Sequence, residues 1–162
     1  MRELMLGVAL CALTAGNASA QAPAAEVTAP IVKFMDAFNK GDMAGAAATH
    51  MPGPDLVIID EVAPFVWRGA DAFKNWAAAL DADSKKQAIT DQKVTISAPT
   101  RTETSGDTAY VIVRAVYAFK LKGAAMREAA QMTFVLKKGA GGWLIAAWTW
   151  TGPKPTRGTA KE

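Results

Sequence analysis

Residues 109–151, AYVIVRAVYAFKLKGAAMREAAQMTFVLKKGAGGWLIAAWTWT, contain three long, mostly apolar segments separated by two glycine-containing turns. We expect strands over residues 109–121, 126–138 and 143–151, because turn residues bound each segment and β-branched and aromatic residues enrich them. The intervening turns are of hairpin length, which favours antiparallel pairing. This half of the chain therefore predicts an antiparallel meander.

The strands are apolar on both faces. A sheet with one face in water alternates apolar and polar residues, whereas in the first of these strands the apolar stretch from Tyr110 to Phe119 is interrupted only by Arg114. Alternation predicts that one face of the last strand carries Trp143, Ile145 and Ala147 and the other carries Leu144, Ala146, Trp148 and Trp150. We expect helices to cover one face and a second copy of the chain to cover the other, giving a homodimer.

The first half of the chain has helical periodicity. Thr28 is a candidate N-cap, and Gly41 ends a helix whose apolar face carries Ile31, Phe34, Met35 and Phe38. A shorter helix is expected over residues 42–48, a strand over 56–60, and a third helix after Gly69. The fold class is therefore α+β, with a curved antiparallel sheet of four to six strands around three N-terminal helices.

The N-terminus resembles a secretory signal peptide. Arg2 precedes the apolar run of residues 4–13, and Ala18-Ser19-Ala20 provides small residues in the A-x-A pattern. A buried N-terminal helix is the alternative. We expect a signal peptide over residues 1–20, a flexible lead-in over 21–28, one domain over 29–151 and a disordered tail over 152–162. Cleavage near Ala20 would place the protein in the periplasm or outside the cell.

The composition argues against several classes of function. The formal net charge of +3 comes from scattered basic residues, so we expect no nucleic-acid partner. The apolar run at the N-terminus is too short to span a bilayer, so no membrane partner is expected. There is no phosphate-binding loop or HExxH motif, His50 is the only histidine, and Cys11 lies in the predicted signal peptide. We therefore expect neither a metal nor a cofactor.

Three local patterns resemble one known superfamily. They are FNKGD (residues 38–42), IIDEVAPFVWRGADAFKNW (58–76) and GGWLI (141–145). Together with the order of helices and strands, they resemble the nuclear transport factor 2-like superfamily, in its SnoaL-like and ketosteroid-isomerase-like branch. The resemblance implies a cone-shaped fold in which the helices and a concave sheet enclose one apolar pocket. It also implies that dimers through the convex face are common.

The resemblance supplies one candidate catalytic residue. Asp60 lies nine residues before Gly69, at the position of the general base of ketosteroid isomerases. The position of the oxyanion-binding tyrosine holds Phe34, and residues 129–133, where a second donor is expected, contain no carboxylate. His50 could pair with Asp60 to move protons, or it could interact with the end of its own helix. Asp60 could instead cap a backbone N–H group or pair with Arg68.

The remaining candidates are aromatic and polar side chains that could contact a small apolar or aromatic molecule. Trp148 and Trp150 could line the mouth of the pocket or form dimer contacts. Three functions remain open: a binding domain, a cofactor-free isomerase, cyclase or dehydratase using Asp60, and a dimeric scaffold with a filled cone. The predicted pocket residues are Phe34, Trp67, Trp76, Tyr110, Tyr117, Gln131, Trp148 and Trp150.

Overall fold

The computed structural model describes residues 24–158, and the predicted signal peptide lies outside them. The chain forms an α+β domain with three helices and one curved sheet of eight strands. The helices are α1 (Ala24–Asn39), α2 (Met43–Ala47) and α3 (Ala72–Gln87). The strands are β1 (Val57–Ile59), β2 (Val66–Arg68), β3 (Ile89–Ile96), β4 (Arg101–Ser105), β5 (Thr108–Leu121), β6 (Ala124–Gly139), β7 (Gly142–Thr151) and β8 (Thr156–Arg157).

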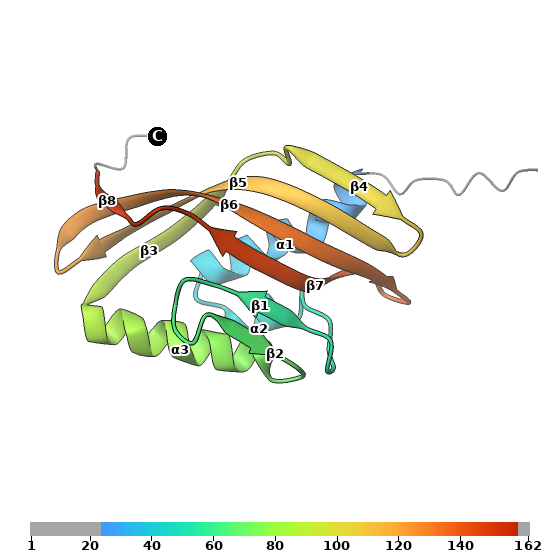
Figure 1. Ribbon diagram of the computed structural model, residues 1–162, viewed down its shortest axis with the longest axis horizontal. Helices are drawn as coiled ribbons and strands as arrows, with labels where there is room; N and C mark the ends of the chain where they lie inside the picture. Colours follow the sequence, from blue (N-terminus) through green and yellow to red (C-terminus); the bar gives the residue numbers. More distant parts are fainter. Residues whose placement is uncertain (1–23, 159–162) are drawn as a thin grey trace, which may run out of the picture.

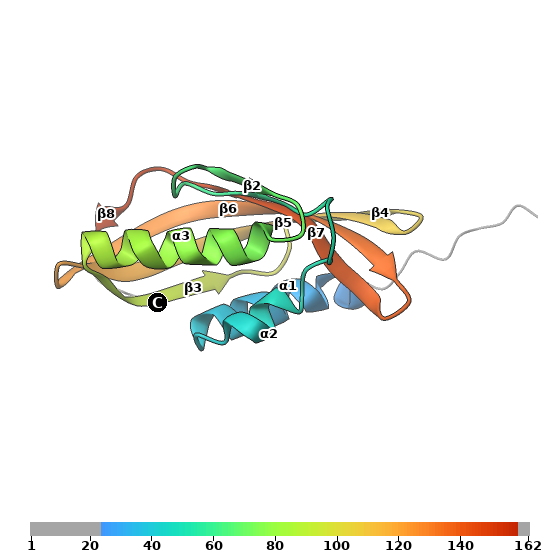
Figure 2. The ribbon, with the colours of Figure 1, turned by 90° about the horizontal axis from the view of Figure 1, so that it is seen from below.

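The sheet is mostly antiparallel, as expected from its short turns. Its order is β2-β1-β7-β6-β5-β3, with β4 also pairing with β5 and β8 with β6. Only β1 and β7 pair in parallel. The long strands β5, β6 and β7 arch over the three helices, which all lie against the concave face (Figures 1 and 2). Among the helices of residues 24–158, none combines the length and apolar character needed to cross a membrane.

Several expected boundaries are wrong. Helix α1 begins at Ala24, within the segment expected to be a flexible lead-in, and Thr28 lies inside it with its hydroxyl donating to the Ala24 carbonyl (3.0 Å). The alternation of residues 94–102 predicts a single strand, but the segment belongs to two strands, β3 and β4, because the chain bends before and after Pro99.

The tail expected to be disordered from residue 152 is also partly ordered. Thr156 and Arg157 form β8 and pair with Arg127 and Met126 of β6. The two-residue strand has no periodicity that the sequence could reveal. Together, the division of residues 94–102 and the presence of β8 raise the number of strands above the expected four to six.

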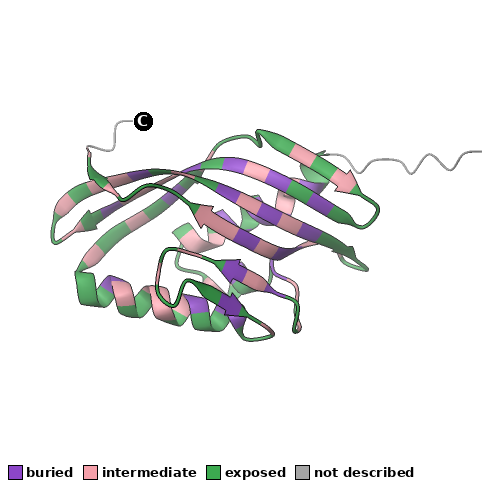
Figure 3. Ribbon diagram, in the orientation of Figure 1, coloured by how far each residue is buried: buried purple, intermediate pink, exposed green. Residues whose placement is uncertain are grey.

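A β-bulge in β7 changes the faces of the tryptophans. Val135 pairs with Ala147, but Leu136 pairs with Ile145, so Ala146 is an extra residue in the strand. An extra residue reverses the alternation beyond it. Trp143 and Ile145 are therefore buried on the same face as Trp148, rather than on the opposite face as alternation predicted. Buried and less buried positions follow one another along the long strands (Figure 3).

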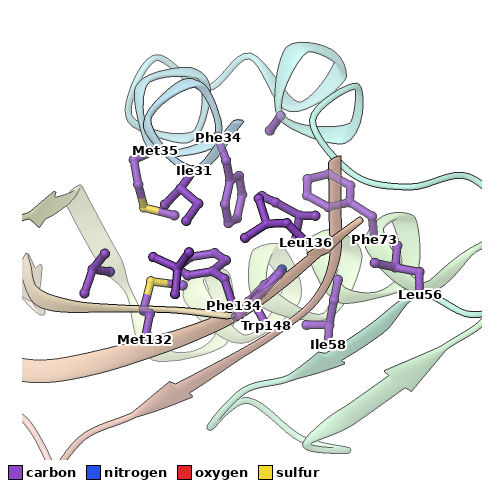
Figure 4. Packing of buried hydrophobic residues seen from close by; sticks show 14 of the residues in the cluster. Ile31, Phe34, Met35, Leu56, Ile58, Phe73, Met132, Phe134, Leu136 and Trp148 are labelled. Carbon is purple, nitrogen blue, oxygen red and sulfur yellow. The ribbon is translucent and has the colours of Figure 1, made fainter. Parts of the chain in front are cut away.

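The core lies between the helices and the concave face of the sheet. Phe34 of α1 is 1% exposed and points toward the sheet, where Phe134 and Trp148 lie (Figure 4). The end of α1 is fixed to β3 by two hydrogen bonds: Asn39 Nδ2 donates to the Val94 carbonyl (2.7 Å), and Val94 N donates to Asn39 Oδ1 (2.8 Å). This packing closes one end of the space under the sheet and leaves the other end open.

Candidate functional site

A cavity of about 360 Å³ lies at this open end, between α1, α3 and the concave face of the sheet. Its volume falls within the range of about 300–1,000 Å³ that is typical of small-molecule sites. Most of its wall is apolar and aromatic, with polar groups concentrated in the segment after β1 and on α3. The aromatic lining consists of Phe34, Phe38, Trp76, Tyr117, Phe119, Trp148 and Trp150.

Asp60 directly follows β1 and lines the cavity. The indole Nε1 of Trp76 donates to its Oδ2 atom (2.6 Å), and the backbone N–H of Glu61 donates to its Oδ1 atom (2.7 Å). Burial raises the pKa of the Asp60 carboxyl above its ordinary value, while these two hydrogen bonds act in the opposite direction. The site therefore holds a fixed carboxylate beside an apolar space, an arrangement that suits either a hydrogen-bond acceptor or a base.

A second carboxyl group, Glu61, lines the mouth of the cavity beside the buried Glu128 of β6. Glu128 is 1% exposed, and its Oε1 atom accepts a hydrogen bond from Trp150 Nε1 (2.7 Å). Although much of Glu61 is exposed, partial burial of its carboxyl and the proximity of Glu128 raise its pKa to about 8. Glu61 therefore holds a proton more readily than an ordinary glutamate does, because of its partial burial and the nearby Glu128.

Tyr117 of β5 forms part of the wall near these carboxyl groups. Its hydroxyl donates to Gln92 Oε1 (2.6 Å), and Gln92 lies in an irregular stretch of β3 where the register shifts between Thr90 and Lys93. Burial, followed by the nearby acidic groups, raises the pKa of the phenol. The hydroxyl is therefore neutral at physiological pH and is oriented by Gln92.

His50 is not part of the cavity lining and has no hydrogen bond to Asp60, so of the two alternatives the structure shows the interaction with the end of its own helix. Its Nε2 atom accepts from Trp148 Nε1 (3.0 Å), and its Nδ1 atom lies 3.0 Å from the Ala46 carbonyl oxygen. An isolated parallel β-bridge between the backbones of His50 and Ile145 fixes His50 beside β7. Burial lowers the pKa of His50 to about 4. The histidine is thus a neutral core residue that positions Trp148.

Asp60 and five of the predicted pocket residues line the cavity, whereas the other predicted pocket residues do not. Tyr110 and Gln131 occupy exposed positions of β5 and β6, because they are out of phase with the buried residues of those strands. Trp67 is 7% exposed and belongs to the packed core. The five predicted residues in the wall are Phe34, Trp76, Tyr117, Trp148 and Trp150.

The sequence analysis missed Glu61, Asp83 and Lys154 in the lining and Glu128 behind it. The resemblance places the second donor within residues 129–133, which contain no carboxylate. Glu128 lies just before that window and is in phase with the buried Met132 and Phe134. Counting back by twos from these apolar residues would have placed it on the inner face.

Residues 27–149 match the family model of the SnoaL-like domain. A search of curated proteins gives no match. Among solved structures, a ketosteroid isomerase-like protein from Erwinia carotovora atroseptica SCRI1043 is similar with a TM-score of 0.62 and 24% identity, covering 81% of this chain and 96% of that chain.

Two further solved structures are similar at lower identity. A nuclear transport factor 2-like superfamily protein from Salmonella enterica serovar Typhimurium LT2 has a TM-score of 0.65 and 16% identity, over 85% of this chain and 94% of that chain. A type 2 hexachlorocyclohexane dehydrochlorinase has a TM-score of 0.66 and 15% identity, over 85% and 90%. At these identities, the similarities show the fold and do not transfer an activity.

Proposed function

Because the chain belongs to the SnoaL-like domain family of the nuclear transport factor 2-like superfamily, we propose that it binds a small, largely apolar or aromatic molecule in the cavity under its sheet. The observation that carries this proposal is the cavity of about 360 Å³ with aromatic side chains on several walls. Flat apolar ligands gain both buried area and ring contacts in such a site. An unfilled cavity gives little support to the alternative of a scaffold with a filled cone.

A cavity-filling variant tests this proposal. Leu80 lines the cavity from α3, so Leu80→Trp should occupy part of the space and weaken binding of the neutral probe 1-naphthylmethanol by at least about tenfold. Binding can be followed by the change in tryptophan fluorescence on titration. Ala78→Trp is the matched control, because Ala78 lies on the exposed side of the same helix.

The two variants distinguish cavity binding from surface binding. We expect the parent protein and Ala78→Trp to bind the probe with the same affinity. Equal binding by Leu80→Trp would place the probe elsewhere, and no saturable binding by the parent would contradict the proposed function.

General base catalysis by Asp60 is the second candidate function. Its carboxylate lies in the cavity wall and is held by Trp76, and the adjacent protonated Glu61 could donate a hydrogen bond to an oxygen that gains negative charge. A protonated carboxyl would thus replace the donor that is missing at Phe34. The proposed class of reaction is proton abstraction next to a carbonyl group, as in an isomerase, cyclase or dehydratase.

A second copy of the chain is the partner we propose for the convex face. Ile59 and Val66 are 44% and 40% exposed and are paired with each other at one end of this face. Val57 of β1 pairs with Ala147 of β7, which pairs with Val135 of β6, so apolar residues extend across these three strands. A continuous apolar surface on the outside of a sheet favours self-association.

Export also remains a proposal. It rests on the charged start, the apolar run of residues 4–13 and the small residues before Gln21. N-terminal sequencing of protein recovered from the periplasm of a bacterial host should begin at Gln21, and an intact Met1 would contradict cleavage.

A further inference from the structure

The mouth of the cavity carries an excess of negative groups, which we call the acidic end. Asp60 and Glu61 come from the segment after β1, Asp83 from α3, and Glu128 from behind the wall on β6. Lys154 is the one basic residue of the described lining. The salt bridges found within residues 24–158 join other pairs, Lys85–Asp81, Arg101–Glu103 and Lys120–Asp91.

Glu128 has an unmet need for a hydrogen-bond donor. Its side chain is 1% exposed, and its Oε2 atom is buried without a hydrogen-bond partner, while Oε1 is bound by Trp150. Gly152 lies directly against this carboxyl group, at a position where a side chain would collide with it. A buried acceptor without a donor is costly, so a proton or a cationic donor near Glu61 and Glu128 would stabilise this end of the cavity.

The surroundings favour an organic cation. In the part of the chain that the structure describes, no three His, Cys, Asp or Glu side chains are grouped so that they could hold a metal ion. Aromatic rings instead lie close to the acidic end: the Tyr117 and Trp150 centroids are 6.3 Å apart, and Tyr117 stacks on Phe119 at 4.5 Å. Ring faces attract ammonium groups as well as apolar bodies.

We propose that the ligand of this cavity is an organic ammonium ion, whose apolar body lies among the aromatic rings and whose protonated amine lies at the acidic end, against Asp60 and Glu61 and in front of the buried Glu128. This inference rests on the proposed function and specifies the ligand class for the same cavity. The ammonium group would supply the positive charge that the acidic end lacks and an N–H donor close to the unpartnered Oε2 atom of Glu128.

Binding of such a cation has a consequence for protons. The cation favours the ionised form of Glu61, whose proton is otherwise retained beside Glu128. Uptake of an ammonium ligand should therefore release a proton from the protein, and uptake of a neutral ligand of the same shape should not. Titration calorimetry in buffers of different ionisation enthalpy measures this difference.

A matched pair of probes tests the inference. At pH 7, 1-naphthylmethylamine is a cation and 1-naphthylmethanol is neutral, and the two share the same ring system. We expect the amine to bind at least about tenfold more tightly and to release a proton, because hydrogen bonds between charged groups are stronger than neutral ones. Calorimetry on the full mature chain gives both quantities.

Variants that each replace one carboxyl group by an amide, which cannot ionise, locate the effect. Glu61→Gln and Glu128→Gln should each reduce the preference for the amine over the alcohol by about fivefold or more. Asp81→Asn is the control, because Asp81 lies on the exposed side of α3 and pairs with Lys85 at 2.6 Å. If Glu128→Gln does not fold, as judged by circular dichroism, Glu61→Gln decides the test.

The outcomes separate this inference from the proposed function. If the alcohol binds and the amine binds no more tightly, the ammonium ligand is ruled out and the apolar site remains. If the preference for the amine is the same in Glu61→Gln and Asp81→Asn, the cation does not lie at the acidic end and the inference fails. If neither probe binds, the proposed function fails, and the inference with it.

Discussion

Two tryptophans in the wall of the cavity each hold a different polar group. Trp76 donates to Asp60, Trp148 donates to His50, and their ring centroids are 5.0 Å apart with nearly perpendicular planes. The two indoles therefore stand between Asp60 and His50. Because burial lowers the pKa of His50 to about 4, its ring stays neutral at physiological pH and does not exchange a proton with Asp60.

Asp60 is the residue on which the catalytic alternative depends. If it is a base, the protein should accelerate exchange of the α-hydrogens of 2-tetralone with deuterium, which NMR measures directly. Asp60→Asn should reduce this rate by about 100-fold or more while keeping affinity within about tenfold, since asparagine can still accept from Trp76. The rate should also fall at acid pH as Asp60 is protonated, with a midpoint above the ordinary carboxyl value, because burial raises the pKa of Asp60.

Asp81→Asn serves as the control and should exchange the ketone at the parent rate. Exchange by Asp60→Asn at that same rate would remove Asp60 from the mechanism and leave the binding function alone.

At the level of single residues, the family resemblance indicated Asp60 but not its acidic neighbours. Asp60 matches the position of the general base in ketosteroid isomerases, nine residues before the glycine that precedes α3. Glu128 could not be recognised in this way, because its burial depends on the phase of β6, and its effect on Glu61 depends on contacts between distant segments. Charges that meet only in the folded chain leave no local pattern.

At the level of elements, the bulge in β7 determines which face of the sheet each tryptophan of this strand occupies. The extra residue, Ala146, brings Trp143 and Trp148 to the same face although alternation separates them. The strand can then contribute Trp143 to the core at one end and Trp148 and Trp150 to the cavity at the other.

Deletion of Ala146 should therefore be strongly destabilising. Without the extra residue, β7 would pair regularly with β6. Either Trp148 and Trp150 or Trp143 and Ile145 would then point away from the concave face. We expect a loss of several kcal/mol in the free energy of unfolding, measured by urea denaturation, since burying large aromatic side chains is worth about 3–5 kcal/mol each. Deletion of Ala140, in the turn between β6 and β7, is the control and should cost much less.

A stable Ala146 deletion that still binds 1-naphthylmethanol would mean that the bulge does not set the face of the tryptophans.

The existence and order of most elements follow from periodicity and turn residues, and these predictions are confirmed. The bulge and β8 could not be predicted in this way, because one inserted alanine and a two-residue strand have no periodicity of their own.

At the level of the whole molecule, the sheet has two faces with different roles. The concave face holds the core and the cavity, and the convex face carries Ile59, Val66 and Tyr110, which are among the most exposed large side chains of the described residues. If the convex face forms a dimer, light scattering at micromolar concentration should give about twice the mass of a single chain.

Val135→Asp tests the surface itself, because Val135 lies on β6 between Tyr110 and Ala147. A charge at that point should shift the protein to the monomer with little change in the cavity, whereas Ala82→Asp on the exposed side of α3 should leave the mass unchanged. A monomeric parent protein would contradict the proposed dimer.

The central claim is that the space under the sheet holds a small apolar molecule, and a crystal structure grown with 1-naphthylmethanol tests it most directly. The account predicts density for the naphthyl ring within the cavity, in contact with Trp150 and Tyr117 and with the hydroxyl directed toward Asp60 or Glu61. A cavity closed by rearranged side chains, or a ring bound only on the outer surface at saturating probe, would contradict it.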